Sequence, residues 1–165
     1  MNKGFNSAAN KAGVKPSCFV AGTLVMAVAG MVAIEKIKSG DKAISTDPET
    51  METSPKIVLE TYIREVTTLV HLTVNGEEIV TTVDHPFYVN SRGFVKAGEL
   101  AIGYELLDVN GNVLLVEKFN VELTDEPTTV YNFQVEDFHT YHVSGFGVLV
   151  HWCIMQSILQ RKCKK

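Results

Sequence analysis

Four short segments of the chain carry side chains that can act as nucleophiles or exchange protons. They are Cys18, Thr81-Thr82-Val83-Asp84-His85-Pro86, His139-Thr140-Tyr141-His142 and His151-Trp152-Cys153. A thiolate is a strong nucleophile, and an imidazole exchanges protons near neutral pH. Each segment alone also has a structural explanation, because free cysteine is commonly a small buried residue. Their combination is what suggests covalent chemistry.

The cysteines are not arranged for a disulfide framework or a metal site. Cys18, Cys153 and Cys163 are odd in number, and their spacing fits no zinc-binding or CxxC pattern. His139 and His142 are three apart in a strand-like stretch, so they face opposite sides, which argues against a shared metal. We therefore expect no metal and no cofactor, and we interpret His142 as structural.

The elements that must position these segments are short strands. Strands are predicted at 23–29, 31–37, 42–45, 58–67, 69–74, 78–83, 105–109, 113–119, 130–135, 139–143 and 148–151. Asn75-Gly76 and Asn110-Gly111 are typical hairpin turns, because both residue types tolerate positive φ. Helix is expected only at 95–100, about one turn, and at 154–162. This pattern predicts an all-β domain, sandwich or barrel, whose two ends meet in space.

Composition and charge exclude several classes of protein. The chain has 165 residues, 45% of them hydrophobic and 21% charged, which is typical of one soluble domain. A net charge of −4 gives no basic surface for nucleic acid or anionic lipid. Residues 1–17 are polar and do not resemble a secretory signal. The uncharged stretch 18–34 is interrupted by glycines, which favours a buried hairpin over a membrane span. The cellular compartment stays open.

Three blocks of sequence, taken in order, resemble a known superfamily. They are CFVAGTLV…IEKIKSGDKAIS, which begins at Cys18, TTVDHPFYV, which contains a Thr-x-x-His motif, and VYNFQVEDFHTYHVSGFGVLVH, which ends at His151. Together they resemble the Hint (hedgehog/intein) superfamily, and specifically bacterial intein-like domains. The resemblance implies a compact, horseshoe-like fold of short antiparallel strands over residues 18–152. Residues 1–17 and 153–165 would then be flanking, extein-like segments.

The resemblance implies that Cys18 attacks the peptide bond before it. Attack on the Ser17 carbonyl would convert the Ser17–Cys18 amide to a thioester, an N-to-S acyl shift. An amide is the more stable of the two, so the step needs a polarised amide, a donor for the oxyanion and a proton for the leaving nitrogen. Each molecule would react once, on itself, with water, a thiol or an amine as the final acyl acceptor.

The Thr-x-x-His motif supplies groups suited to that step. His85 can protonate the leaving nitrogen, because imidazole titrates near neutral pH. Thr82 can hydrogen-bond the scissile carbonyl or amide, and the backbone around Asp84 can assist. A thiol has an ordinary pKa of roughly 8.5, so Cys18 needs help to ionise, from His85 or His139.

The C-terminal junction departs from the family's pattern. Inteins end in His-Asn, and the Asn side chain cyclises to a succinimide that cuts the chain. Here Trp152 follows His151. Indole has no amide nitrogen at that position, so this cleavage is expected not to occur. Either Trp152 replaces Asn in a domain that otherwise cleaves at both ends, which we favour slightly, or the domain is a subtype that uses only its N-terminal reaction.

Three further residues occupy positions that matter in the family. Cys153 stands where splicing inteins carry a second nucleophile, although it is equally explained as an ordinary tail residue. His139 stands where family members often place a histidine that assists the final steps. Asn132 replaces an Asp that helps coordinate the two cleavages, and it can hydrogen-bond but cannot act as a base.

The leading interpretation is therefore self-processing in cis on the domain's own flanking segments, as a monomer without nucleic acid or membrane partners. The main alternative is a noncatalytic Hint-fold spacer or remnant within a larger secreted or toxin-like protein. A hedgehog-like sterol transferase is disfavoured, because no sterol-recognition segment follows. A cysteine hydrolase acting on other molecules is also disfavoured, because Cys18 heads the domain directly after a leader.

Overall fold

A computed structural model describes residues 17–152, which form twelve antiparallel strands and two short 3-10 turns. The strands are β1 (Phe19–Val20), β2 (Leu24–Ala27), β3 (Gly30–Ala33), β4 (Lys42–Thr46), β5 (Thr53–Val74), β6 (Glu77–Thr81), β7 (Pro86–Val89), β8 (Gly93–Lys96), β9 (Glu105–Leu107), β10 (Val113–Val135), β11 (Thr140–Val143) and β12 (Val148–His151). The 3-10 turns are η1 (Ile34–Lys36) and η2 (Ala97–Glu99). The all-β prediction is confirmed. Within residues 17–152, no helix is long and apolar enough to cross a membrane.

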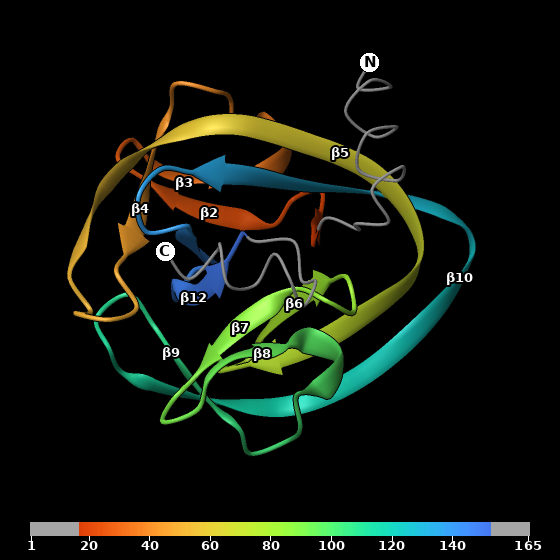
Figure 1. Cartoon of the computed structure of the whole chain (residues 1–165). Helices are drawn as coiled ribbons and strands as arrows, with labels where there is room; N and C mark the ends of the chain where they lie inside the picture. The colour runs from red at the N-terminus through yellow and green to blue at the C-terminus, as the bar shows by residue number, and fades with distance from the viewer. Residues whose placement is uncertain (1–16, 153–165) are drawn as a thin grey trace, which may run out of the picture.

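Two long, curved strands form the outside of the molecule. β5 and β10 pair along most of their length and bend around the shorter strands, as Figure 1 shows. Their register shifts between Leu123 and Thr128, where the intervening residues of β10 have no partner on β5. Pro127 lies in this irregularity, where a residue without an N–H costs no ladder hydrogen bond.

The main differences from the predicted elements lie in these two strands. Predicted strands 58–67 and 69–74 are one continuous strand, because Thr68 between them is β-branched and stays paired, with Leu123. Predicted strands 113–119 and 130–135 are also one continuous strand, since residues 120–123 and 128–129 pair with β5 on either side of the unpaired residues 124–127. The expected helical turn at 95–100 is a 3-10 turn confined to Ala97–Glu99. The expected helix at 154–162 lies outside the described residues.

The end of β10 brings the two ends of the domain together. Tyr131 of β10 is the strand partner of Phe19, directly after Cys18. The next residue, Asn132, hydrogen-bonds the main-chain carbonyl of Trp152. Neighbouring residues of one strand therefore hold the N-terminal and the C-terminal junctions. The two ends of the domain therefore lie close together, as the strand pattern predicted.

The interior consists of one large apolar cluster and one small one. The large cluster is lined by side chains from nearly every strand, and it includes Phe19, Phe87, Phe133 and Tyr141, all fully buried. The small cluster contains Cys18 with Leu69 and Val130. All four residues of β12 are buried, between β11 and β7. The residues of the two predicted junctions are thus held by a well-packed framework.

Candidate self-processing site

The Thr82–His85 segment is a short loop that is held at both ends. It leaves β6 after Thr81 and enters β7 at Pro86. On its outer side, η2 donates two main-chain hydrogen bonds to it, from Ala97 N to His85 O and from Gly98 N to Val83 O, both 2.8 Å. A Cβ on Gly98 would lie 2.6 Å from Val83 Cγ1, so only glycine permits this close approach.

Two adjacent threonines hold the main chain of Cys18. The Cys18 N–H donates to Thr82 Oγ1 at 3.0 Å. The Cys18 carbonyl accepts from the Thr82 N–H at 3.0 Å and from the Thr81 hydroxyl at 2.9 Å. Sequence reasoning assigned a role to Thr82 and none to Thr81. Since Thr81 is the strand partner of Phe19, strand pairing is the signal that points to it.

The side chain of Cys18 is fully buried, and this environment disfavours the thiolate form. Burial raises its pKa far above the ordinary value, the nearby charge of Arg64 lowers it, and that of Asp84 raises it again. Ser17, also buried, donates from its hydroxyl to the main-chain carbonyl of Asp84 at 3.2 Å. The residues on both sides of the Ser17–Cys18 bond, the predicted scissile bond, are therefore tied to the Thr82–His85 loop.

His85 is buried in an aromatic environment. Its ring lies 4.2 Å from that of Phe19, centroid to centroid. Burial lowers its pKa well below 6.5 and the charge of His151 lowers it further, while the His151 main-chain carbonyl favours the protonated form. Within residues 17–152, neither ring nitrogen meets a partner at hydrogen-bonding geometry. His85 is therefore a neutral imidazole packed against Phe19, the residue that follows Cys18.

The C-terminal junction is held by the side-chain amide of Asn132. Its Nδ2 donates to the Trp152 carbonyl at 2.9 Å. Its Oδ1 accepts from the Tyr141 hydroxyl at 2.6 Å and from the Phe133 N–H at 2.8 Å. Both donors bind Oδ1, which fixes the orientation of the amide. Tyr141 had no predicted role, and only the fold brings it between Cys18 and Asn132.

Trp152 donates two hydrogen bonds to His139. Its main-chain N–H donates to the His139 carbonyl at 3.0 Å, and its indole Nε1–H donates to His139 Nδ1 at 2.9 Å. His139 has a φ of 60°, in the left-handed region that a residue with a side chain rarely adopts. Burial lowers the pKa of His139, so the ring is a neutral acceptor. The indole thus takes the nitrogen that His139 would offer to a reaction.

His151 and His142 have different surroundings. His151 is buried, with its ring 4.8 Å from Phe94 in an edge-to-face arrangement and 6.2 Å from the His139 ring. His142 hydrogen-bonds the Thr46 hydroxyl at 2.7 Å and the Gly147 carbonyl at 2.8 Å, away from both junctions. Cys153 lies outside the described residues.

The family of the chain is decided by its sequence profile. Residues 24–153 match the profile of the pretoxin HINT domain, which is most of the chain. The chain belongs to the pretoxin HINT domain family. The predicted Hint superfamily membership is confirmed.

Solved structures agree with this family. The HINT domain is 60% identical to a bacterial intein-like domain from Clostridium thermocellum, with a TM-score of 0.80, over 81% of this chain and 97% of that one. A DnaB intein from Synechocystis sp. PCC 6803 shares the fold with a TM-score of 0.70 at 16% identity, over 84% of this chain and 99% of that one. The predicted intein-type fold is confirmed.

One curated relative places the domain in a larger setting. An uncharacterized protein of Methanocaldococcus jannaschii is 36% identical over 83 residues, which cover 46% of this chain. The match spans only 12% of that protein's length. The similar segment is thus a small part of a much longer polypeptide.

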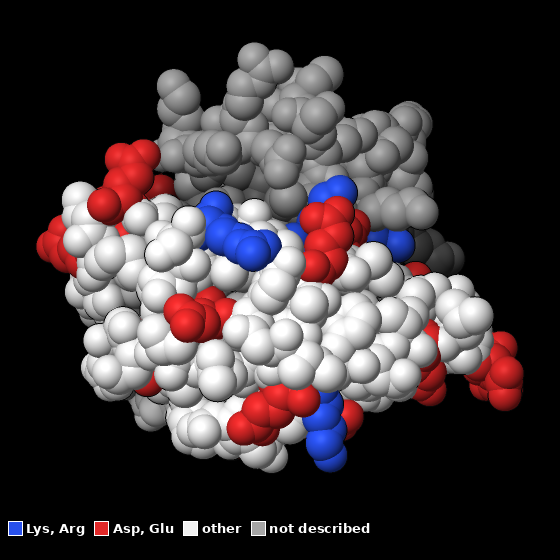
Figure 2. All heavy atoms as spheres, turned by 90° about the horizontal axis from the view of Figure 1, so that it is seen from below, with Lys and Arg blue, Asp and Glu red and all other residues white. Residues whose placement is uncertain are grey.

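Among residues 17–152, no group of three or more His, Cys, Asp or Glu side chains could hold a metal ion. On the face of the HINT domain that Figure 2 shows, Lys and Arg side chains are scattered among acidic and uncharged ones. No basic patch gathers on that face.

Stability of the HINT domain is expected to fall as pH decreases from 7 to 5. Burial is the main cause that lowers the pKa values of His85, His139 and His142 below 6.5 in the folded state. The unfolded chain therefore binds more protons below pH 6.5, and each histidine costs up to about 1.4 kcal/mol per pH unit. Two groups oppose this trend: His71, whose pKa is raised against the effect of burial by its hydrogen bonds with Glu122 and Glu78, and Asp84, whose pKa is raised mainly by burial. Urea unfolding midpoints of a Cys18→Ala chain should drop over this range, and an unchanged midpoint would contradict the assignment of neutral histidines.

Proposed function

We propose that this HINT domain breaks the Ser17–Cys18 bond by an N-to-S acyl shift. The observation that carries the proposal is the hydrogen bond from the Cys18 N–H, the nitrogen of the scissile amide, to Thr82 Oγ1 at 3.0 Å. The threonine of the Thr-x-x-His motif thus contacts Cys18, the proposed nucleophile. The identity of 60% to a bacterial intein-like domain supports the same chemistry. The Thr82 hydroxyl therefore lies at hydrogen-bonding distance from the nitrogen that must gain a proton when the C–N bond breaks.

The thioester then determines the products. Attack by water, a thiol or an amine at the Ser17 carbonyl releases residues 1–17 from a domain that begins at Cys18 and extends to residue 152. The acting form is a monomer, because nucleophile, Thr82 and both junctions come from one chain. The high pKa that burial gives Cys18 makes ionisation of the thiol the slow requirement of the reaction.

The C-terminal half of the reaction stops at Trp152. The indole cannot cyclise, and it donates to His139 Nδ1, the nitrogen that would take part in final steps. The arrangement of Asn132 against the Trp152 carbonyl is nevertheless intact. This combination favours replacement of an Asn in a site that otherwise cleaves, with His151 before that position in the sequence and Cys153 after it.

The hydrogen bond from the Trp152 indole to His139 also supports a second candidate function, that of a noncatalytic spacer. If its contacts with His139 reflect a disabled site, the domain is a folded spacer within a longer toxin-like protein, as the family's pretoxin description suggests. Incubation of the full chain with dithiothreitol separates the two functions by intact mass. Self-processing predicts a fragment ending at Ser17, and the spacer predicts an unchanged mass over days.

Thr82→Val is expected to slow release of the 1–17 fragment by about 100-fold, because valine keeps the shape and removes the acceptor of the scissile N–H. The matched control is Thr129→Val, at an exposed threonine of β10. Release rates in dithiothreitol, measured by mass, give the ratio. Equal rates in Thr82→Val and the parent chain would remove Thr82 from the mechanism.

A further inference from the structure

A chain of hydrogen bonds runs from the scissile amide to a carboxyl group. The Cys18 N–H donates to Thr82 Oγ1 at 3.0 Å, and the Thr82 hydroxyl donates onward to Asp84 Oδ1 at 3.1 Å. A hydroxyl that accepts on one side and donates on the other can reverse both bonds as protons shift. We propose that Asp84 supplies, through Thr82, the proton that the Cys18 nitrogen gains as the Ser17–Cys18 bond breaks. This inference rests on the proposed function.

The step balances without a co-reactant. Cys18 Sγ forms a bond to the Ser17 carbonyl carbon, and the C–N bond breaks with its electron pair left on nitrogen. The nitrogen takes a proton from Thr82 Oγ1, which takes one from Asp84. The thiol proton passes from Sγ to solvent, and solvent returns one to Asp84. The sum is an isomerisation of amide to thioester.

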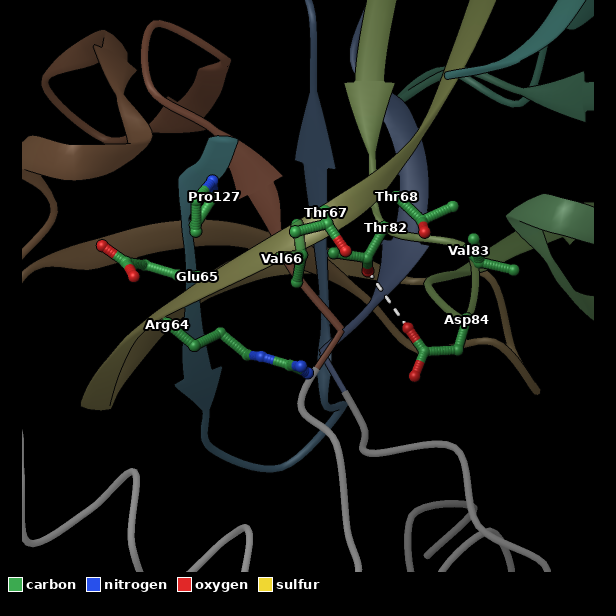
Figure 3. A pocket seen from close by; sticks show the side chains of 9 residues that line it. All are labelled: Arg64, Glu65, Val66, Thr67, Thr68, Thr82, Val83, Asp84 and Pro127. Atoms are coloured by element: carbon green, nitrogen blue, oxygen red, sulfur yellow. Dashed lines mark hydrogen bonds between the residues drawn. The ribbon is translucent and has the colours of Figure 1, made fainter. Parts of the chain in front are cut away.

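A surface pocket gives solvent access to Asp84, the carboxyl group at the end of this series of hydrogen bonds. The pocket has a volume of about 590 Å³, and its lining includes Thr82 and Asp84. Figure 3 shows the Thr82–Asp84 hydrogen bond at its wall and the Arg64 side chain extending across it from β5. Water in this pocket can reprotonate Asp84, whereas Cys18 itself is fully buried.

The hydrogen-bond geometry favours Asp84 over His85 as the source of the proton. Burial raises the pKa of Asp84, against the hydrogen bond from Thr82 and the charges of Arg64 and Lys96, which lower it. Asp84 therefore keeps a proton at higher pH than an exposed aspartate. Within residues 17–152, neither ring nitrogen of His85 meets a hydrogen-bond partner, whereas Asp84 reaches the Cys18 nitrogen through Thr82. Asp84 acts through Thr82, so it is a positioning and proton-supplying residue, and Thr82 is the group that touches the reacting nitrogen.

The first test measures cleavage of the full chain in dithiothreitol as a function of pH. Asp84→Asn keeps an oxygen for the Thr82 hydroxyl and has no acidic proton, so release of residues 1–17 should slow by about 100-fold. Its rate should then rise steadily with pH, without the decline that ionisation of Asp84 gives the parent chain. Asp84→Glu should restore part of the rate and the decline. Asp125→Asn, at an exposed carboxylate of β10, is the matched control and should behave as the parent.

The second test works whether or not the chain cleaves. In the unreactive Cys18→Ala chain, the amide proton of residue 18 should titrate together with the Asp84 carboxyl carbon in NMR spectra, and Thr82→Val should uncouple them. An amide shift that ignores the Asp84 titration would overturn the relay, as would an Asp84→Asn chain that cleaves within twofold of the parent with the same pH profile. Absence of cleavage in the parent chain would instead contradict the proposed function.

Discussion

Replacement of Cys18 by alanine should abolish the thiol-induced release of residues 1–17. The reaction has one nucleophile, and alanine leaves the two threonine hydrogen bonds to the main chain of residue 18 in place. The small cluster of Cys18, Leu69 and Val130 loses only one sulfur atom, so the fold should persist at a cost of about 1 kcal/mol. Intact mass over days in dithiothreitol should stay at the full length.

The matched control for this loss is Cys163→Ala, which removes a thiol far along the sequence from the junction. It should release the fragment at the parent rate. A Cys18→Ala chain that still loses residues 1–17 would show that hydrolysis at this bond needs no thiol, and the acyl-shift mechanism would be wrong.

Trp152→Asn should create C-terminal cleavage where the present chain has none. The Asn132 amide already donates to the residue 152 carbonyl at 2.9 Å, with its orientation fixed by Tyr141 and Phe133. A hydrogen bond to that oxygen polarises the carbon that an Asn side chain attacks. Removal of the indole also frees Nδ1 of His139 for the reaction. The expected product is a chain ending at residue 152, seen by intact mass.

Trp152→Ala separates the two consequences of that substitution. It removes the indole from His139 and supplies no amide nitrogen, so it should leave the C-terminal junction uncut. Adding Asn132→Leu to Trp152→Asn should slow the new cleavage by about 100-fold, since the donor to the carbonyl is lost. If Trp152→Asn leaves the junction intact, the subtype that uses only its N-terminal reaction is the better description.

The fold class was predictable because turn residues are local signals. Asn75-Gly76 connects β5 and β6 as a hairpin, as its preference for positive φ indicates, with φ values of 52° and 85°. The length of β5 and β10 was not predictable, since a strand continues wherever a partner satisfies its backbone. The partner strand lies far away in sequence, and no local sequence pattern identifies it.

The members of the site were visible in the sequence, and their contacts were not. The Thr-x-x-His spacing placed Thr82 beside the scissile bond, and the structure adds that it contacts the amide nitrogen. The role of Tyr141 depends on a hydrogen bond to Asn132 between two strands. The neutral state of His85 depends on burial against Phe19, which only packing decides.

The central claim is a thioester between Ser17 and the thiol of Cys18, and hydroxylamine tests it directly. Hydroxylamine attacks thioesters far faster than amides, so the full chain treated at neutral pH should release residues 1–17 as a hydroxamate at Ser17. The remaining fragment should begin with a free amino group on Cys18. Recovery of only the intact chain, or of a fragment cut at another bond, would contradict the account.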